Sequence, residues 1–296
     1  MQESVSHSTA GVHASLLYYL HACPICKRDA QRHYCRVPSL YNAHEFITYD
    51  RCTVCGTVFR NPRLPDDYRL WAYEERPSES EPPQLEPATI AHARYMLGQL
   101  QALLQVSSPP RLLDFGCGAG GFLRQALEAG FDVMGLEVNK ALVAHVSSQY
   151  GIPTFQGLIT DPGFKDERFD VIVSSQVFEH LLDPSRTLKA VQDHLNPNGL
   201  LLIEVPNLSH FRERLKKGST MDDAHLFYFN RRSLSDLLTG SGFHIVRVEE
   251  GLRPFRFTAK LARPMTAFGV SLWERFFSLC QVKTSLSIIA RLQSSR

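Results

Sequence analysis

Three glycines in the stretch "RLLDFGCGAGGFLRQAL", residues 111–127, have a spacing that suits an adenosine cofactor. Gly116, Gly118 and Gly121 satisfy the pattern G-x-G-x-x-G, directly after an apolar run and directly before a helical one. At such a turn, backbone N–H groups point beyond the sheet edge, and glycine lets a ligand approach the backbone without an intervening Cβ. The loop therefore predicts an adenosine cofactor, with the Glu137 carboxylate accepting hydrogen bonds from its ribose.

An acidic side chain just before this loop discriminates between two cofactors. Asp114 lies two residues before Gly116, inside the last turn of the apolar run. A carboxylate there would repel the pyrophosphate of NAD, whereas it would attract a cation. S-adenosylmethionine carries a sulfonium and an ammonium group and no phosphate. Asp114 therefore favours S-adenosylmethionine, and an NAD-dependent oxidoreductase on a similar sheet is the first alternative.

Four successive motifs carry a family resemblance: "LLDFGCGAGGFL", "GLEVN", "RFDVIVSSQVFEHLLDP" and "NPNGLLLIEVPN". They resemble the motifs of class I S-adenosylmethionine-dependent methyltransferases, over about residues 88–250. The resemblance implies a methyltransferase in which the loop and Asp114 hold the methionine part of the cofactor, while the backbone at Leu158 replaces an adenine-binding Asp. The implied cofactor-binding residues are Asp114, Gly116, Cys117, Gly118, Glu137, Val138, Leu158, Ser175 and Gln176.

Two histidines are candidates for proton removal from a methyl acceptor. His180, in "QVFEHL", follows the fourth strand at the cofactor face, and its pKa near neutrality suits a general base. Its neighbour Glu179 could orient the imidazole or contact substrate. His225 precedes an aromatic run that includes Phe227, which we expect in the core, and Tyr228.

Two C-x-x-C pairs predict a structural zinc site. The four cysteines are Cys23, Cys26, Cys52 and Cys55. Two residues between thiolates let both bind one tetrahedral ion from a single tight turn, and four thiolates leave no position open for catalysis. Gly56 suits the turn after the second pair, whereas Lys27 at the matching place does not. The N-terminus lacks a signal-like basic region and no apolar stretch approaches the length of a membrane span, so we expect a cytoplasmic protein. In a reducing compartment this cysteine pattern points to metal binding rather than disulfides.

The region around the second cysteine pair adds a further resemblance. "YDRCTVCGTVFRNPRLPDDY" is similar to the N-terminal zinc-binding region of some methyltransferases that act on sugar nucleotides or in secondary and cell-surface metabolism. It implies a small-molecule acceptor, such as a sugar, lipid-linked or secondary-metabolite intermediate. A zinc-ribbon nucleic-acid binder or RNA methyltransferase is the second alternative. A formal net charge of only +2 and the lack of aromatic platforms argue against it.

Alternating apolar strands and helices must position these residues. The pattern from residue 88 onward predicts a doubly wound, Rossmann-like α/β sheet, and the resemblance implies seven strands ending in an antiparallel hairpin, "GFHIVRVEEG" with "TSLSIIARL". Helices are expected at 88–106, 121–130, 139–151 and 184–198, with Gly199 just past the last.

Composition divides the 296 residues into three parts. We expect a zinc-ribbon-like module at 1–75, a proline-rich acidic linker at 76–87 and the methyltransferase domain at 88–296. A basic and aromatic insertion at about 252–282 suits a helix on a membrane surface or over a hydrophobic acceptor. We favour a lid helix packed on the sheet. The sequence leaves the oligomeric state open.

Overall fold

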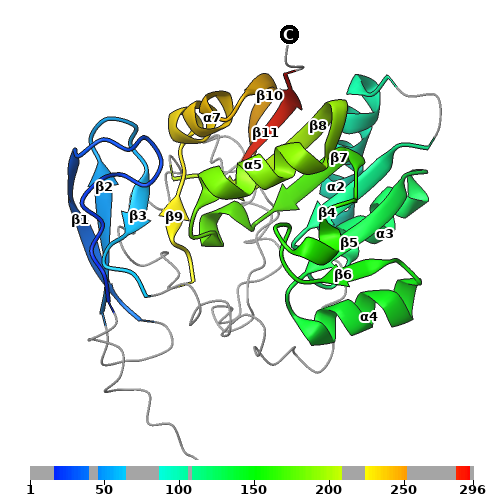
Figure 1. Ribbon diagram of the computed structural model, residues 1–296, viewed down its shortest axis with the longest axis horizontal. Helices are drawn as coiled ribbons and strands as arrows, with labels where there is room; N and C mark the ends of the chain where they lie inside the picture. The colour runs from blue at the N-terminus through cyan, green and yellow to red at the C-terminus, as the bar shows by residue number, and fades with distance from the viewer. Residues whose placement is uncertain are drawn as a thin grey trace, which may run out of the picture.

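A seven-stranded sheet forms the centre of the molecule (Figure 1). The computed structural model describes residues 17–39, 46–64, 87–105, 109–208, 224–251 and 285–293. Within them, the strand order is β10-β11-β8-β7-β4-β5-β6. The parallel strands are β4 (Arg111–Phe115), β5 (Asp132–Glu137), β6 (Thr154–Gln156), β7 (Phe169–Ser175) and β8 (Leu195–Pro206).

The last two strands reverse direction at one edge of this sheet. β10 (Phe243–Gly251) pairs antiparallel with β11 (Ser285–Leu292), and β11 pairs antiparallel with β8 in a register from Ser285 opposite Pro206 to Arg291 opposite Leu200. The predicted Rossmann-like α/β sheet with an antiparallel terminal hairpin is therefore confirmed.

Helices cover both faces of the sheet. Successive side chains of each strand point to opposite faces, so each strand contributes to two apolar cores. On β4, Leu112 joins the core formed with α2 (Pro87–Leu103), α3 (Gly121–Glu128) and α4 (Lys140–Tyr150). Leu113 joins the other core, which includes residues of α5 (Pro184–His194) and α7 (Arg231–Gly240). Two apolar layers around one sheet explain why its central strands are apolar on both faces.

Helix α5 ends earlier than the sequence predicted. Its N-terminus is capped by the Asp183 carboxylate, which accepts from the N–H groups of Ser185 and Arg186, but the helix stops at His194 and β8 begins at Leu195. The physical reason is Pro197, since a proline disfavours helical backbone in the residue before it. The expected continuation to Gly199 was therefore wrong.

A separate four-stranded sheet holds the cysteine pairs. It consists of β1 (Gln31–Pro38), β2 (Phe46–Cys52), β3 (Val58–Arg60) and β9 (Phe227–Tyr228), in the antiparallel order β1-β2-β3-β9. Strand β9 belongs to the range that the sequence assigned to the methyltransferase domain. Residues 224–230 lie between the two sheets, and an isolated bridge joins Phe229 to Asn207 just after β8 (Figure 1).

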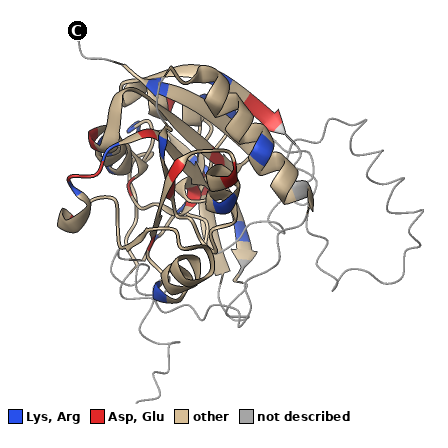
Figure 2. Ribbon diagram, turned by 90° about the vertical axis from the view of Figure 1, so that its right-hand side faces the viewer, with Lys and Arg blue, Asp and Glu red and all other residues tan. Residues whose placement is uncertain are grey.

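Two predicted segments lie outside the described residues: the linker at 76–87 except for Pro87, and the insertion at 252–282. Of the helices that the structure does describe, none combines the length and apolarity needed to cross a bilayer. In the described ranges, basic and acidic residues are interspersed over the ribbon (Figure 2).

Candidate active site

The glycine loop leaves the carboxyl end of β4 and turns sharply into α3. Gly116 and Gly118 both have positive φ, 77° and 54°, which glycine adopts without steric cost. The N–H of Gly116 donates to the Leu136 carbonyl at 2.8 Å, and a Cβ on Gly116 would collide with the Val177 side chain. A Cβ on Gly118 would meet nothing within 4 Å among the described residues. The loop is thus tightly packed against Val177 at Gly116, whereas the space beside Gly118 is open.

Asp114 is buried directly beneath this loop. Its side chain is 3% exposed, and burial, aided by the nearby Glu137 carboxylate, raises its pKa to about 7. A carboxyl group with this pKa is poorly compensated by its protein neighbours. A cation placed beside it would favour the ionised form, so the site is electrostatically suited to a positively charged ligand.

Glu137 ends β5 and connects the loop to the next strand. Its Oε2 accepts from the N–H of Gly118 at 2.9 Å, while its Oε1 accepts from the N–H groups of Val138 and Asn139 at 2.9 and 3.0 Å. These three bonds hold the carboxylate at the sheet edge. The structure thus brings together Gly118, Glu137 and Val138, which were all predicted to bind the cofactor.

The loop after β6 holds the adenine candidate. The N–H of Leu158 donates to Asp161 Oδ2 at 2.8 Å, and the N–H of Asp161 donates back to the Leu158 carbonyl at 3.0 Å. The Asp161 carboxylate therefore folds back beside Leu158. The Asp161 carboxylate and the Leu158 backbone thus lie next to each other.

The end of β7 is fixed by a buried acid on β8 that the sequence analysis missed. Glu204 is 3% exposed; its Oε2 accepts from Ser175 Oγ at 3.2 Å, and its carbonyl accepts from the Gln176 N–H at 2.8 Å. The Nε2 of His92 on α2 lies 3.1 Å from Glu204 Oε1. The one available clue was an acid inside the apolar run "LLLIEVP".

The three predicted catalytic residues lie together beyond β7. His180 and Glu179 belong to the short helix η3 (Phe178–His180), and the ring of His225 lies 4.7 Å from the ring of His180. Ligating atoms of Glu179, His180 and His225 are all within 4.8 Å of one another. Val177, just before η3, packs on Gly116, so this cluster adjoins the glycine loop.

The tautomer of His180 follows from its hydrogen bond. Its Nδ1 lies 3.0 Å from the Ala224 carbonyl, which can only accept, so Nδ1 carries the proton. In the neutral ring, Nε2 then has a lone pair and can take a proton. Glu179 is buried, and its carbonyl accepts from the Leu226 N–H at 2.7 Å, which ties η3 to the segment that carries His225.

The aromatic residues after His225 differ in their surroundings. Phe227 is fully buried in the main core, as the sequence predicted. The Tyr228 ring lies 5.2 Å from His225 and 5.7 Å from Tyr49 of β2. The Tyr49 hydroxyl donates to the His225 carbonyl at 3.0 Å. The four-stranded sheet therefore directly supports the backbone that carries His225.

The four cysteines of the C-x-x-C pairs converge on one point. Cys23 Sγ lies 3.7 Å from Cys55 Sγ, and Cys26 Sγ lies 3.5 Å from Cys52 Sγ. A tetrahedral zinc site with Zn–S bonds of about 2.3 Å needs sulfurs about 3.8 Å apart. A hydrogen bond from Cys23 lowers the pKa of Cys55 to about 4, so the cluster favours a thiolate. Both observations fit a metal ion.

The two cysteine turns are nearly equivalent, contrary to one expectation. Lys27 has a φ of 59° and Gly56 a φ of 78°, and the N–H of each donates to the carbonyl of the first cysteine of its pair. The prediction that Lys27 does not suit this turn was therefore wrong. Its Nζ also donates to the Pro24 carbonyl at 2.9 Å, which adds a contact that glycine lacks.

A comparison with protein families identifies the sheet and its edge. A family model described as "Methyltransferase domain" matches residues 90–248, a little over half of the chain. The match begins in α2 and ends in β10. It includes the glycine loop, Glu137 and the histidine pair, whereas the four cysteines lie outside it.

Curated relatives match part of this chain. The chain is 29% identical over 135 residues to a "Probable S-adenosylmethionine-dependent methyltransferase" of Mycolicibacterium smegmatis, covering 45% of this chain and 52% of that protein. It is 31% identical over 106 residues to a ubiquinone biosynthesis O-methyltransferase of Bradyrhizobium diazoefficiens, covering 33% and 40%. The chain thus spans about half, or less, of these relatives.

A solved structure has the same fold. The structure of a S-adenosylmethionine-dependent methyltransferase from Archaeoglobus fulgidus matches with a TM-score of 0.50 and 20% identity, covering 76% of this chain and 100% of that one. At this identity the likeness concerns the fold.

Proposed function

This chain belongs to the methyltransferase domain family, and from that premise we propose that it transfers a methyl group from S-adenosylmethionine to a small-molecule acceptor. The observation that supports the cofactor most directly is the buried Asp114 carboxyl under an open glycine loop, with a pKa raised to about 7. A cationic ligand would relieve this unfavourable burial, whereas the pyrophosphate of NAD would aggravate it.

Each strand end has a part in holding the cofactor. Asp114 and the loop residues Gly116, Cys117 and Gly118 hold the methionine part, and Glu137 with the Val138 backbone binds the ribose. Leu158, with Asp161 beside it, holds the adenine, and Ser175 and Gln176 line the cavity. The hydrogen bonds of Glu137 to the Gly118 and Val138 amides support this assignment, because they already orient the carboxylate.

His180 acts as the general base. When bound, S-adenosylmethionine supplies a methyl group made electrophilic by its sulfonium. The acceptor atom would form the new bond to the methyl carbon as the carbon–sulfur bond breaks, and its proton would pass to Nε2 of His180. The Nδ1 proton stays on the ring and is donated to the Ala224 carbonyl. The Glu179 carboxylate stabilises the imidazolium that results, and the ring of His225 packs edge-on against the ring of His180.

The cysteine cluster binds zinc, and this zinc is structural. Sulfurs of the two pairs that lie 3.5 and 3.7 Å from each other suit a closed tetrahedral site. The ion fixes the turn that precedes β1 and the turn that joins β2 to β3. Through Tyr49 and β9 that sheet supports the His225 segment.

The acceptor is a small molecule such as a sugar, lipid-linked or secondary-metabolite intermediate. One relative is named for ubiquinone biosynthesis, whose acceptor is small. A formal net charge of only +2 does not favour a nucleic acid as the acceptor.

Calorimetry with S-adenosylhomocysteine and with NAD tests the cofactor. We expect the chain to bind S-adenosylhomocysteine and not NAD, and Asp114→Ala to lose the binding while Asp132→Ala keeps it. Asp132 is a matched control because it is an exposed acid at the first residue of β5, whereas Glu137 is at the last. Binding of NAD with equal or higher affinity would refute the proposal.

A further inference from the structure

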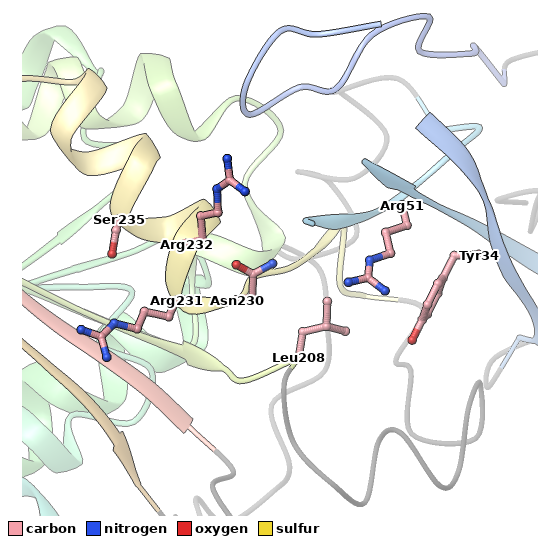
Figure 3. A pocket seen from close by; sticks show the side chains of 7 residues that line it. All are labelled: Tyr34, Arg51, Leu208, Asn230, Arg231, Arg232 and Ser235. Carbon is pink, nitrogen blue, oxygen red and sulfur yellow. The ribbon is translucent and has the colours of Figure 1, made fainter. Parts of the chain in front are cut away.

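We infer that a pocket between the four-stranded sheet and α7 binds an anionic group of the methyl acceptor, either phosphate or carboxylate. This inference rests on the proposed function, since it describes the acceptor of that reaction. The pocket has a volume of about 600 Å³. Its lining residues come from β1, β2, the end of β8 and the first turns of α7: Tyr34, Arg51, Leu208, Asn230, Arg231, Arg232 and Ser235 (Figure 3).

Three arginines give the pocket its chemistry. Arg51 reaches in from β2 toward Asn230, and Arg231 and Arg232 diverge from the start of α7 (Figure 3). Arg232 lies 3.6 Å from the exposed carboxylate of Asp236, whereas no described acid forms an ion pair with Arg51 or Arg231. A guanidinium presents its donors as a planar fork that matches phosphate and carboxylate oxygens.

The start of α7 adds to this positive field. Arg231 and Arg232 are its first two residues, so their backbone N–H groups point out of the helix at its positive end. Asn230 caps the helix by accepting from the Ser233 N–H at 2.9 Å, and its Nδ2 donates to the Cys55 carbonyl at 3.2 Å. The pocket wall is thus tied to the cysteine cluster and is held rigidly.

The pocket lies close to the candidate active site, although the two share no lining residue. Asn230 lies five residues after His225, which limits their separation to at most about 18 Å. Rings lead from one to the other: His180 to His225, His225 to Tyr228, and Tyr228 to Tyr49, two residues before Arg51. A volume near 600 Å³ is typical of metabolite sites. An acceptor could therefore extend from the histidine pair into the pocket.

Direct binding of small anions tests the inference without a known acceptor. Calorimetry at low salt would compare inorganic pyrophosphate, as a phosphate probe, with citrate, as a carboxylate probe. We expect one of them to bind, and its identity assigns the acceptor's anionic group. Arg51→Ala and the double variant Arg231→Ala/Arg232→Ala should each weaken that binding by about tenfold or more.

Controls separate this inference from the proposed cofactor. Arg51→Lys keeps the charge but lacks the fork, so it should weaken binding less than Arg51→Ala. Arg124→Ala, an exposed arginine on α3 remote from the pocket, should leave binding unchanged. All variants should bind S-adenosylhomocysteine as the parent chain does, which also checks their folding. If the parent chain binds pyrophosphate but not S-adenosylhomocysteine, the proposed function fails and the pocket remains.

Three outcomes would overturn the inference. One is that neither anion binds a chain that does bind S-adenosylhomocysteine. Another is that Arg124→Ala weakens anion binding as much as the pocket variants do. The third is that a short single-stranded RNA binds at the pocket arginines while both small anions fail, which would identify the partner as nucleic acid.

Discussion

The carboxyl edge of the seven-stranded sheet and the four-stranded cysteine sheet are assembled over very different distances along the chain. At the sheet edge, Gly118 and Glu137 are bonded across 19 residues. In the cysteine sheet, Tyr49 and His225 are bonded across 176. The first region depends on local turns and the second on long-range pairing. The histidine pair lies where the two regions meet, so cofactor binding and catalysis should respond differently when either region is damaged.

Removing the metal should have the largest effect and should act on one region only. Structural zinc sites contribute on the order of 10 kcal/mol to folding. We expect chelation, or Cys52→Ser, to unfold the small sheet and abolish methyl transfer while S-adenosylhomocysteine still binds. Metal analysis by mass spectrometry and cofactor calorimetry on the same sample measure both. Cys35→Ser is the matched control, since Cys35 lies outside the cluster. Full activity of a metal-free chain would contradict the account.

His180→Ala should separate catalysis from cofactor binding. Loss of a general base lowers the turnover rate by about 10²–10⁴-fold. We expect this loss in kcat with an unchanged affinity for S-adenosylhomocysteine, because His180 bonds to Ala224 of the other segment rather than to the glycine loop. His145→Ala on α4 serves as the control. Equal losses in turnover and cofactor affinity would remove His180 as the base.

Asp114→Asn should stabilise the fold while it impairs cofactor binding. Because the pKa of Asp114 is raised from 3.8 to about 7, ionisation destabilises the folded chain. The stability is full below pH 4 and is lost as pH rises through 7. The neutral amide avoids this loss, which is worth up to about 4 kcal/mol at pH 8. Urea unfolding at pH 5 and 8 measures it. A variant equally destabilised at both values would contradict the raised pKa.

Tyr49→Phe should have the smallest effect and tests the contact between the regions. It removes the hydrogen bond to the His225 carbonyl, worth about 1 kcal/mol, and keeps the ring that packs on Tyr228. We expect kcat to fall severalfold without a change in cofactor affinity. Tyr95→Phe, on the exposed side of α2, is the control. An unchanged kcat in Tyr49→Phe would mean that the small sheet does not position His225.

The same contrast explains what could be predicted from the sequence. The strands of the large sheet and helices α2 to α5 follow local patterns, so the fold and the residues at its carboxyl edge could be assigned directly, whereas α7 was not among the expected helices. Asp114 and Glu137 adjoin the loop that reveals them. The pairing of Phe227 and Tyr228 with β3 could not be foreseen, since two residues carry no periodicity and their partners lie far away in the sequence.

Two further misses have specific physical causes. Lys27 adopts a left-handed backbone because the metal-type turn requires it, at a cost that the surrounding contacts offset. The contact of His92 with Glu204 was missed, because nothing in the helical pattern indicates that the buried acid of a distant strand lies opposite. Side-chain pairs between elements depend on register, which single-sequence patterns do not determine.

The most direct test of the cation-binding site at Asp114 is the ratio of the affinities for S-adenosylmethionine and S-adenosylhomocysteine. Calorimetry between pH 6 and 8.5 measures this ratio. The two ligands differ by the methyl group and the positive charge of the sulfonium, so their ratio reports the charge of Asp114. We predict that the ratio shifts toward S-adenosylmethionine as pH rises through about 7, and that Asp114→Asn abolishes the shift. A ratio that is independent of pH in the parent chain would contradict the claim that Asp114 selects a cationic cofactor.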